Sequence, residues 1–315
     1  MGGREMDSNQ LNVIFSSDDT YAQHLGAAMY SLLSHNADFE AIHIYVIDNA
    51  ISADSREKLE QISRQFSNSE IHWISFEKWK SQLALNMAWN ISVSAYARLM
   101  MASMLPQNLD RVLYMDCDMI VCDSLASLWA TDLHGKVVGA VQDDISDGTK
   151  AAVSLLPHDP YFNSGLLLVD LAAWREQNIG KKCLEFIHNH NGTVVHHDQG
   201  TLNGVLKSNW HRLPPEYNLM TIHYMFNLNQ IQRYYADHSP FYSVEEINTA
   251  KKIPVILHFT PSFTSRPWVK GCAHPERKRY WDAVRQTPWR EAKPVRDTSK
   301  WYVKLINWRY RTFKC

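Results

Sequence analysis

The 315-residue chain is 45% hydrophobic, has a net charge of −1 and contains five cysteines without CxxC spacing. This length can bury one large core, and the near-neutral charge gives no reason to expect nucleic acid as a partner. The odd number and scatter of the cysteines argue against a disulfide framework or zinc ribbon and favour the reducing cytoplasm. The polar start is unlike a signal peptide, and no apolar run approaches the roughly 20 residues that span a bilayer.

The first part of the chain predicts alternating strands and helices after a disordered lead at residues 1–10. The apolar runs predict strands at 11–15, 41–47, 71–76 and 111–115. The helical spacings predict helices at 21–35, 52–66 and 94–104, with Ser52 as an N-cap and Pro106 as a stop. This order implies an α/β fold with a mostly parallel sheet and helices on both faces.

Beyond Val121 the pattern is less regular. It predicts strands at 136–141, 165–169 and 255–257, and helices at 172–190 and 199–206. The polar, turn-rich stretch 143–160 is expected to form a mobile loop over the site.

Two acidic clusters follow predicted strands: Asp18-Asp19 after the first and Asp116-Cys117-Asp118 after the fourth. Ligands bind at the carboxyl ends of parallel strands, so both clusters should face one crevice. Carboxylates at i and i+2 can hold one hard cation such as Mn²⁺ or Mg²⁺. Alternatively, Asp118 only caps the turn and Asp116 is a solvated strand end. A haloacid-dehalogenase-like nucleophile is a further alternative, although that motif normally lies on the first strand.

Two further clusters carry candidate chemistry. Asp198 and Gln199 open the predicted helix at 199–206, where Asp198 could instead cap that helix. His258 ends a predicted strand and precedes Arg266-Pro267-Trp268. A histidine at a strand end is often structural, but His258 would be a third metal ligand if it shares the crevice with Asp116 and Asp118.

These motifs occur together in the order of a known family. They are FSSDDTY (15–21), YARL (96–99), LYMDCD (113–118), YFNSG (161–165), DQGTLN (198–203), and His258 with RPW (266–268). Over roughly residues 11–270 the chain resembles glycosyltransferase family 8. Within that family it looks most like bacterial lipooligosaccharide and lipopolysaccharide α-galactosyltransferases, and more distantly like glycogenin.

The resemblance implies a GT-A type nucleotide-sugar-binding fold and a role for each matching position. Ser16, Asp18 and Tyr21 match residues that hold uracil and ribose. Asp116, Asp118 and His258 match the ligands of Mn²⁺ (or Mg²⁺). The positions around the donor sugar are Arg98, Asn163, Asp198 and Gln199. Arg266 matches a basic residue, usually Lys, at the diphosphate. Asp143 is expected to contact the acceptor or to be a solvated loop acid. The chain departs from the family at Thr20, where Asn is common, and by two extra residues between His258 and Arg266.

The implied activity is metal-dependent, retaining transfer of a hexose from a UDP-sugar to a bacterial surface glycan or glycolipid, with galactose favoured over glucose. The neutral amide of Gln199 is a weak nucleophile. Same-face attack is therefore expected, with Gln199 stabilising the oxocarbenium-like centre and Asp198 holding sugar hydroxyls. Two alternatives are a glycogenin-like self-glycosylating protein, which needs an acceptor Tyr on the chain, and a nucleotide-sugar-binding module without turnover.

Residues 11–275 are assigned to the catalytic domain and 276–315 to a basic, aromatic C-terminal segment. From Lys293 onward, seven Lys or Arg residues accompany a single acid, Asp297. Trp301, Leu305 and Trp308 follow at i, i+4 and i+7. Such a segment suits an anionic membrane surface, or else forms a helix docked on the core. The expected location is the cytoplasm, peripheral at the inner face of the plasma membrane.

Overall fold

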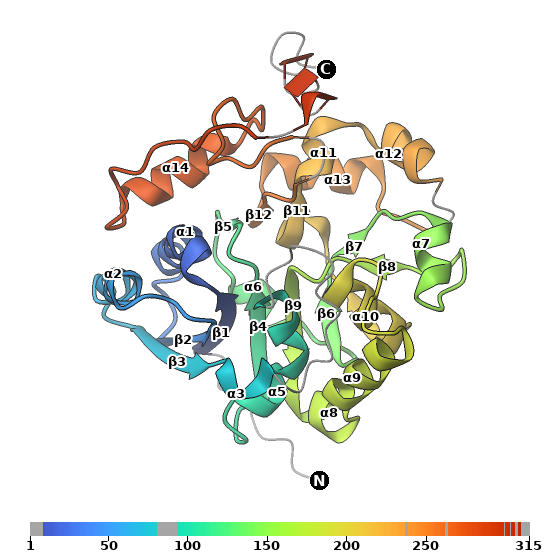
Figure 1. Cartoon of the computed structure of the whole chain (residues 1–315), viewed down its shortest axis with the longest axis horizontal. Coiled ribbons are helices and arrows are strands. Elements are labelled where there is room, and N and C mark those ends of the chain that lie inside the picture. Colours follow the sequence, from blue (N-terminus) through green and yellow to red (C-terminus); the bar gives the residue numbers. More distant parts are fainter. Residues whose placement is uncertain are drawn as a thin grey trace.

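A seven-stranded sheet with the strand order β10-β6-β9-β4-β1-β2-β3 forms the centre of the protein (Figure 1). The computed structural model describes residues 9–80, 94–236, 239–261, 264–298, 300–302, 304–305 and 308–309. The strands are β1 (Gln10–Ser17), β2 (Ala41–Asp48), β3 (Ser69–Ser75), β4 (Arg111–Met115), β6 (Val138–Ala140), β9 (Leu166–Asp170) and β10 (Trp210–Arg212). All neighbours pair in parallel except β9, which is antiparallel to β4 and β6. The predicted mostly parallel sheet is confirmed.

The two faces of the sheet build separate parts of the core. Along β1, Ile14 joins one hydrophobic cluster, whereas Val13 and Phe15 join the other. Successive side chains of a strand point to opposite faces, so a strand covered on both sides must be apolar throughout. Helices α1 (Ala22–Ser34) and α2 (Ala53–Ser63) cover one face. The other face is covered by α5 (Met101–Met104), α8 (Leu171–Glu176), α9 (Ile179–Asn189) and α10 (His197–Leu206).

Local sequence signals account for α1 and α2. The helical-spaced residues of α1 (Leu25, Ala28, Met29 and Leu32) are all fully buried. A one-turn 3-10 helix, η1 (Asp19–Tyr21), precedes α1. The Ser52 hydroxyl accepts the N–H of Ser55, so the predicted N-cap of α2 is confirmed.

Several predicted elements have other bounds. The 94–104 helix is divided into α4 (Ser94–Ala97), a 3-10 turn η2 (Arg98–Met100) and α5. The 172–190 helix breaks at Asn178, whose φ of 53° lies in the left-handed region that asparagine tolerates. The predicted loop at 143–160 contains α7 (Asp147–Ala152), capped by Ser146. Gln10 already belongs to β1, and residues 1–8 of the predicted lead lie outside the described residues.

Two small sheets accompany the large one, and the first of them contains β5, which follows β4 in the chain. One has the order β11-β12-β5, formed by β11 (Leu219–Met220), β12 (Ile256–His258) and β5 (Met119–Val121). The other pairs β7 (Gln142–Asp143) with β8 (Tyr161–Phe162). In the first, His258 lies opposite Met119. This pairing places the end of β12 beside Asp118.

Short helices complete the fold. They are α3 (Glu77–Lys80), α6 (Ala126–Trp129), η3 (Pro215–Asn218), α11 (Thr221–Met225), α12 (Leu228–Tyr235), α13 (Val244–Lys252) and α14 (Arg277–Arg285). Figure 1 shows α11 to α14 gathered with β11 and β12 beyond one end of the large sheet.

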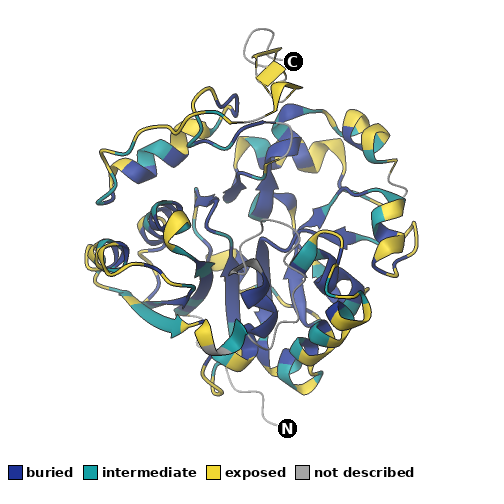
Figure 2. Ribbon diagram, viewed as in Figure 1, coloured by how far each residue is buried: buried dark blue, intermediate teal, exposed yellow. Residues whose placement is uncertain are grey.

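The helix that follows the predicted boundary at residue 275 packs on the rest of the fold. Tyr280 and Val284 of α14 are buried in one cluster with Ala27 of α1. Farther on, Val295 forms a β-bridge with Val269. Beyond this bridge the described aromatic residues are solvent-exposed, with Trp301 exposed to 75%, and Figure 2 shows this end of the chain as exposed. Within the described part of the chain, no helix is long and apolar enough to cross a membrane.

Candidate active site

Two carboxylates and one imidazole converge at the end of β4. The His258 Nε2 atom lies 3.3 Å from Asp118 Oδ1 and 3.9 Å from Asp116 Oδ2. The side chains of Asp116 and Asp118 are only 25% and 8% exposed. Asp116 is therefore not a solvated strand end, and Asp118 turns toward other side chains rather than only capping its own turn. The three residues predicted from the sequence to be metal ligands are therefore close together in the structure.

Glycine at position 165 leaves room for this cluster. A Cβ atom there would collide with the His258 ring and would lie 2.9 Å from Asp116 Oδ2. One ligand atom from each of Asp116, Asp118 and His258 lies within 4.8 Å of the other two. Two carboxylate oxygens and an imidazole nitrogen are donors that suit Mn²⁺ or Mg²⁺. The residues therefore fit a divalent cation.

Two arginines hold the acidic side chains. The buried Arg98 guanidinium donates to Asp116 Oδ1 at 2.7 Å and to the Ser164 carbonyl at 2.6 Å. Its Nε lies 3.0 Å from Asp198 Oδ2. Arg266 donates to the other carboxylate of the pair, Asp118. The guanidinium groups thus anchor the acids from two sides.

Burial and charge shift the two aspartates in opposite directions. Burial raises the pKa of Asp116, although Arg98 opposes it. Burial also acts to raise the pKa of Asp118, but the opposing effect of its surroundings, above all the charge of Arg266, is larger and holds that pKa below its usual range. Asp118 is therefore the more strongly ionised carboxylate, as a cation ligand must be.

A chain of amides fixes the tautomer of His258. The backbone N–H of Gly165 donates to Asn163 Oδ1 at 3.0 Å, which identifies that atom as the oxygen. The same oxygen accepts from Asn218 Nδ2 at 3.0 Å, so Asn218 turns its own oxygen toward His258 Nδ1 at 2.9 Å. Nδ1 must then carry the proton, which leaves the Nε2 lone pair facing the carboxylates. Asn218 is a positioning residue for the candidate metal ligand.

A second set of amide contacts fixes Gln199. Its Oε1 accepts from the backbone N–H of Ser164 and from Asn163 Nδ2, both at 3.1 Å. Its Nε2 donates to Asp143 Oδ2 at 3.2 Å. Burial raises the pKa of Asp143, although the amide donors of Asn163 and Gln199 act to lower it. Asp143 is part of the site and not a solvated loop acid.

Asp198 does not cap α10. Its Oδ2 atom accepts from the Ser164 hydroxyl at 3.0 Å and faces Arg98. The side chain is 10% exposed, so it is held inside the site.

Two of the predicted nucleotide-binding residues, Asp18 and Tyr21, lie at the start of α1, where Tyr21 and Arg266 both pack against Trp268. Asp18 accepts the N–H groups of Thr20 and Tyr21 and so caps η1. The Tyr21 ring packs edge-on to Trp268 at 6.2 Å, and the Arg266 guanidinium lies 5.3 Å from the centroid of Trp268.

Ser16 and Asp19 diverge from each other at the same strand end. The carbonyl of Ser16, on β1, accepts from the Cys117 thiol at 3.4 Å, which places it next to the acidic pair. Asp19 points elsewhere and accepts the N–H of Ser52.

Three site residues had no predicted role. The Tyr114 hydroxyl donates to Asp116 Oδ1 at 3.0 Å, and Ser164 contacts Arg98, Asp198 and Gln199. Both residues lie inside motifs identified in the sequence, LYMDCD (113–118) and YFNSG (161–165), so their position next to predicted site residues could have indicated a role. Asn218 lies in no such motif and ends a short 3-10 helix, so no sequence pattern indicated it.

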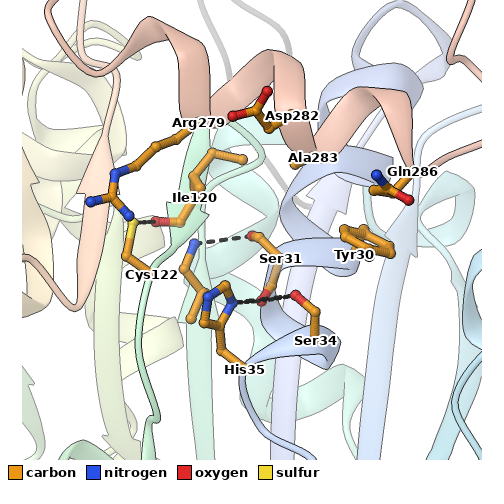
Figure 3. Close-up of a pocket in the computed structure, with 11 residues that line it drawn as sticks. Tyr30, Ser31, Ser34, His35, Ile120, Cys122, Arg279, Asp282, Ala283 and Gln286 are labelled. Carbon is orange, nitrogen blue, oxygen red and sulfur yellow. Dashed lines mark hydrogen bonds between the residues drawn. The ribbon is translucent and has the colours of Figure 1, made fainter.

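A separate pocket of about 360 Å³ lies between α1, β5 and α14 (Figure 3). Its lining includes Tyr30, Ile120, Cys122 and Arg279. None of the residues predicted for the active site lines it.

Similarity to known proteins agrees with this geometry. The sequence model for glycosyl transferase family 8 matches residues 12–272. The chain belongs to glycosyltransferase family 8. The family resemblance seen in the sequence is thereby confirmed, and the protein is a glycosyltransferase.

This family 8 chain is similar to bacterial proteins along most of its length. It is 29% identical over 282 residues to general stress protein A of Bacillus subtilis (strain 168), covering 89% of this chain and 94% of the relative. It is 27% identical over 313 residues to the lipopolysaccharide 1,2-glucosyltransferase of Escherichia coli (strain K12), covering 95% and 86%.

The fold matches the solved structure of a galactosyltransferase. The galactosyltransferase LgtC, solved with donor and acceptor sugar analogues, superposes with a TM-score of 0.72 at 26% identity, covering 90% of this chain and all of that one. The predicted GT-A type fold is confirmed.

Proposed function

We propose that this glycosyltransferase moves a hexose from a UDP-hexose to a bacterial surface glycan or glycolipid and retains the anomeric configuration of the donor. The observation that carries the proposal is the convergence of Asp116, Asp118 and His258 with Asp198 and Gln199 at one strand edge. The similarity to LgtC, a galactosyltransferase, and to a lipopolysaccharide glucosyltransferase supports this donor and acceptor class.

Asp116, Asp118 and His258 would hold Mn²⁺ or Mg²⁺, and such an ion supplies positive charge that stabilises a diphosphate leaving group. Arg266 is placed to add a fixed charge, since it donates to Asp118 and packs against Trp268. When donor binds, we expect Arg266 to turn from Asp118 to a phosphate oxygen. Its planar fork suits that contact. Ser16, Asp18 and Tyr21 would hold the uridine.

Gln199 and Asp198 would act on the sugar. The backbone N–H of Ser164 fixes the amide oxygen of Gln199, which would face the positive charge that develops at the anomeric carbon. Asp198 is held by Arg98 and would accept hydrogen bonds from sugar hydroxyls. A neutral amide favours same-face attack over a covalent intermediate. Asn163 and Arg98 complete the donor-sugar side, and Asp143 lies where an acceptor hydroxyl could reach it.

Galactose is our proposed donor sugar, with glucose as the alternative. We propose residues 11–275 as the catalytic domain and 276–315 as the C-terminal segment, whose helix α14 packs on α1. The exposed residues Trp301, Leu305 and Trp308 would insert into an anionic membrane surface. The location that we propose is accordingly the inner face of the plasma membrane, in the cytoplasm.

The test is hydrolysis of a panel of UDP-hexoses by the purified chain with Mn²⁺ and without acceptor. We expect slow release of UDP, fastest from UDP-galactose, that stops with EDTA and returns with Mn²⁺. Equal rates with and without exhaustive chelation would refute the metal role. Failure to hydrolyse or bind any UDP-hexose would refute the donor class.

A further inference from the structure

A second group of metal-binding side chains lies on the other half of the large sheet. His43 of β2 and Glu70 and His72 of β3 each turn one donor atom toward a common point. His43 Nδ1 lies 3.2 Å from His72 Nε2. Glu70 Oε2 lies 3.6 Å from the first nitrogen and 3.5 Å from the second.

These three separations match a tetrahedral zinc site. Zn²⁺ binds nitrogen and oxygen donors at about 2.0–2.2 Å, so two ligands of a tetrahedron lie about 3.4 Å apart. A hydrogen bond between the two imidazoles would explain the nitrogen–nitrogen distance alone. The carboxylate oxygen of Glu70, almost equally close to both nitrogens, adds a third donor of a kind that Zn²⁺ binds.

The backbone preorganises the group. In the parallel register, His43 lies opposite Glu70, and His72 follows two residues later on the same face. The ring of Tyr45 stacks on His72 with centroids 4.8 Å apart and fixes the plane of that imidazole. Ligands on paired strands are held more rigidly than ligands on loops. β3 is the edge strand, so the group is open to solvent on one side.

The group is distinct from the candidate active site. His43 pairs in register with Asn12 of β1, whereas the acidic crevice begins at Asp18, directly after the end of β1 and about six residues further along the chain. At about 3.3 Å per residue, this separates the two places by about 20 Å along the strand. Their chemistry also differs, because two imidazoles and one carboxylate select Zn²⁺ over the Mn²⁺ or Mg²⁺ that an acid-rich site accepts.

We propose that His43, Glu70 and His72 form a zinc site with one coordination position left for water. Zn²⁺ bound there ties the edge strand β3 to β2 and stabilises the folded protein. Because all three ligands are partly exposed, at 25%, 64% and 34% of their side chains, the ion enters from solvent without opening the core.

The test is a Zn²⁺ titration of the full chain after removal of metals. An Asp118→Asn background removes one ligand of the other cluster, so the remaining Zn²⁺ reports on the proposed site. In that background we expect one bound Zn²⁺ and a rise in melting temperature. Glu70→Gln or His72→Asn should weaken binding by more than about 100-fold, because even an outer-shell change at a metal site costs about 10–100-fold.

Two control variants show whether Zn²⁺ binding depends on these three ligands in particular. His211→Asn alters a histidine whose ring lies near His134 but which belongs to no convergent group among the described residues, so it should leave Zn²⁺ binding unchanged. Glu70→Gln changes an exposed side chain and should fold normally, which covers the case in which His72→Asn does not. In wild-type crystals soaked with Zn²⁺, anomalous scattering should place an ion among the three ligands. Equal Zn²⁺ affinity with and without Glu70 and His72, or no ion among them, would overturn the proposal.

Discussion

Asn218 Oδ1 lies 2.9 Å from His258 Nδ1, and this contact decides which nitrogen of His258 is free to bind a cation. Asn218→Ala should therefore raise the Mn²⁺ concentration for half-maximal activity by about 10–100-fold, as loss of an outer-shell partner does at other metal sites. Asn218→Asp keeps the acceptor for His258 and should restore most of the affinity. Activity titrated with Mn²⁺ measures the effect.

The control for this change is Asn209→Ala, which removes a partly buried amide that donates to Gln177 at 2.8 Å. Its Mn²⁺ dependence should equal that of the wild type. If the two alanine variants shift the Mn²⁺ dependence equally, Asn218 acts only through stability.

Gly165→Ala should remove the activity while leaving the fold intact. The added methyl group would overlap the His258 ring and press on Asp116. The matched control is Gly148→Ala in α7, where the nearest atom to a new Cβ is 3.9 Å away. We expect at least about a 100-fold loss of turnover for the first variant only, since it displaces the proposed metal ligands. Circular dichroism and turnover together would check this, and an active Gly165→Ala enzyme would show that the cluster does not bind a catalytic cation.

Gln199→Ala should lower kcat by about 100-fold, the effect of removing one group that stabilises transition-state charge. The donor KM should change little, because the charge that Gln199 faces develops only during reaction. Gln177→Ala, which removes an amide outside the site, should change neither constant. Steady-state kinetics would distinguish the proposal from a ground-state role, which would raise KM at constant kcat.

Acid should destabilise the protein partly through His24. Burial of this ring, with a smaller contribution from Arg266, lowers its pKa from 6.5 to about 3. Above pH 6.5 both folded and unfolded states hold the ring neutral, so its contribution to stability is complete. Between pH 6.5 and 3 the unfolded state binds one more proton, and the free energy of unfolding falls by about 1.4 kcal/mol per pH unit. Burial also lowers the pKa of His223 and of His274 to about 3, so these two rings should contribute to the same pH dependence.

His24→Phe should remove the part of this pH dependence that comes from His24. It keeps an aromatic ring stacked against Trp268, since the His24 and Trp268 centroids are 3.7 Å apart. Denaturant unfolding at pH 7, 6, 5 and 4 would measure it. As the pH falls, the free energy of unfolding of the variant should decrease less than that of the wild type. In the control variant His134→Gln, which changes a side chain that is 68% exposed, the free energy of unfolding should depend on pH as it does in the wild type. Parallel curves for His24→Phe would contradict the buried neutral ring.

Deletion of residues 297–315 should release the enzyme from anionic vesicles and preserve activity on a short soluble acceptor. The cut lies beyond the bridge between Val295 and Val269, so the folded part keeps that contact. Each cation near an anionic surface contributes about 1 kcal/mol, and salt should weaken that share. Vesicle sedimentation of the full and shortened chains measures it. An insoluble shortened chain would mean that the segment docks on the core instead.

The strands β1, β2 and β4 could be predicted from the sequence because they are mostly buried on both faces and read as apolar runs. The acidic pair could also be predicted, since it leaves such a strand at the edge where ligands bind. The antiparallel direction of β9 could not, because strand direction depends on the connection and not on the residues of the strand. The break at Asn178 was missed because helical periodicity resumes directly after it.

The site was predicted best where its residues form local motifs. His258 could be nominated as a ligand but not placed, because its position depends on the pairing of β12 with β5. Asn218 had no local signal at all, since its role exists only through Asn163 and His258, which lie far from it in the sequence. Hydrogen-bonded support for a site is therefore the part that sequence patterns reveal least.

The pairing of β12 with β5 also has a consequence for how the protein is made. Arg266 and Asp118 are 148 positions apart in the chain, so the site closes only after a long loop has been ordered. Contacts of such separation form slowly because loop entropy must be overcome first. A chain still lacking β12 has its aspartates but neither His258 nor Arg266. Incomplete chains should thus be unable to split a nucleotide sugar before the whole enzyme exists.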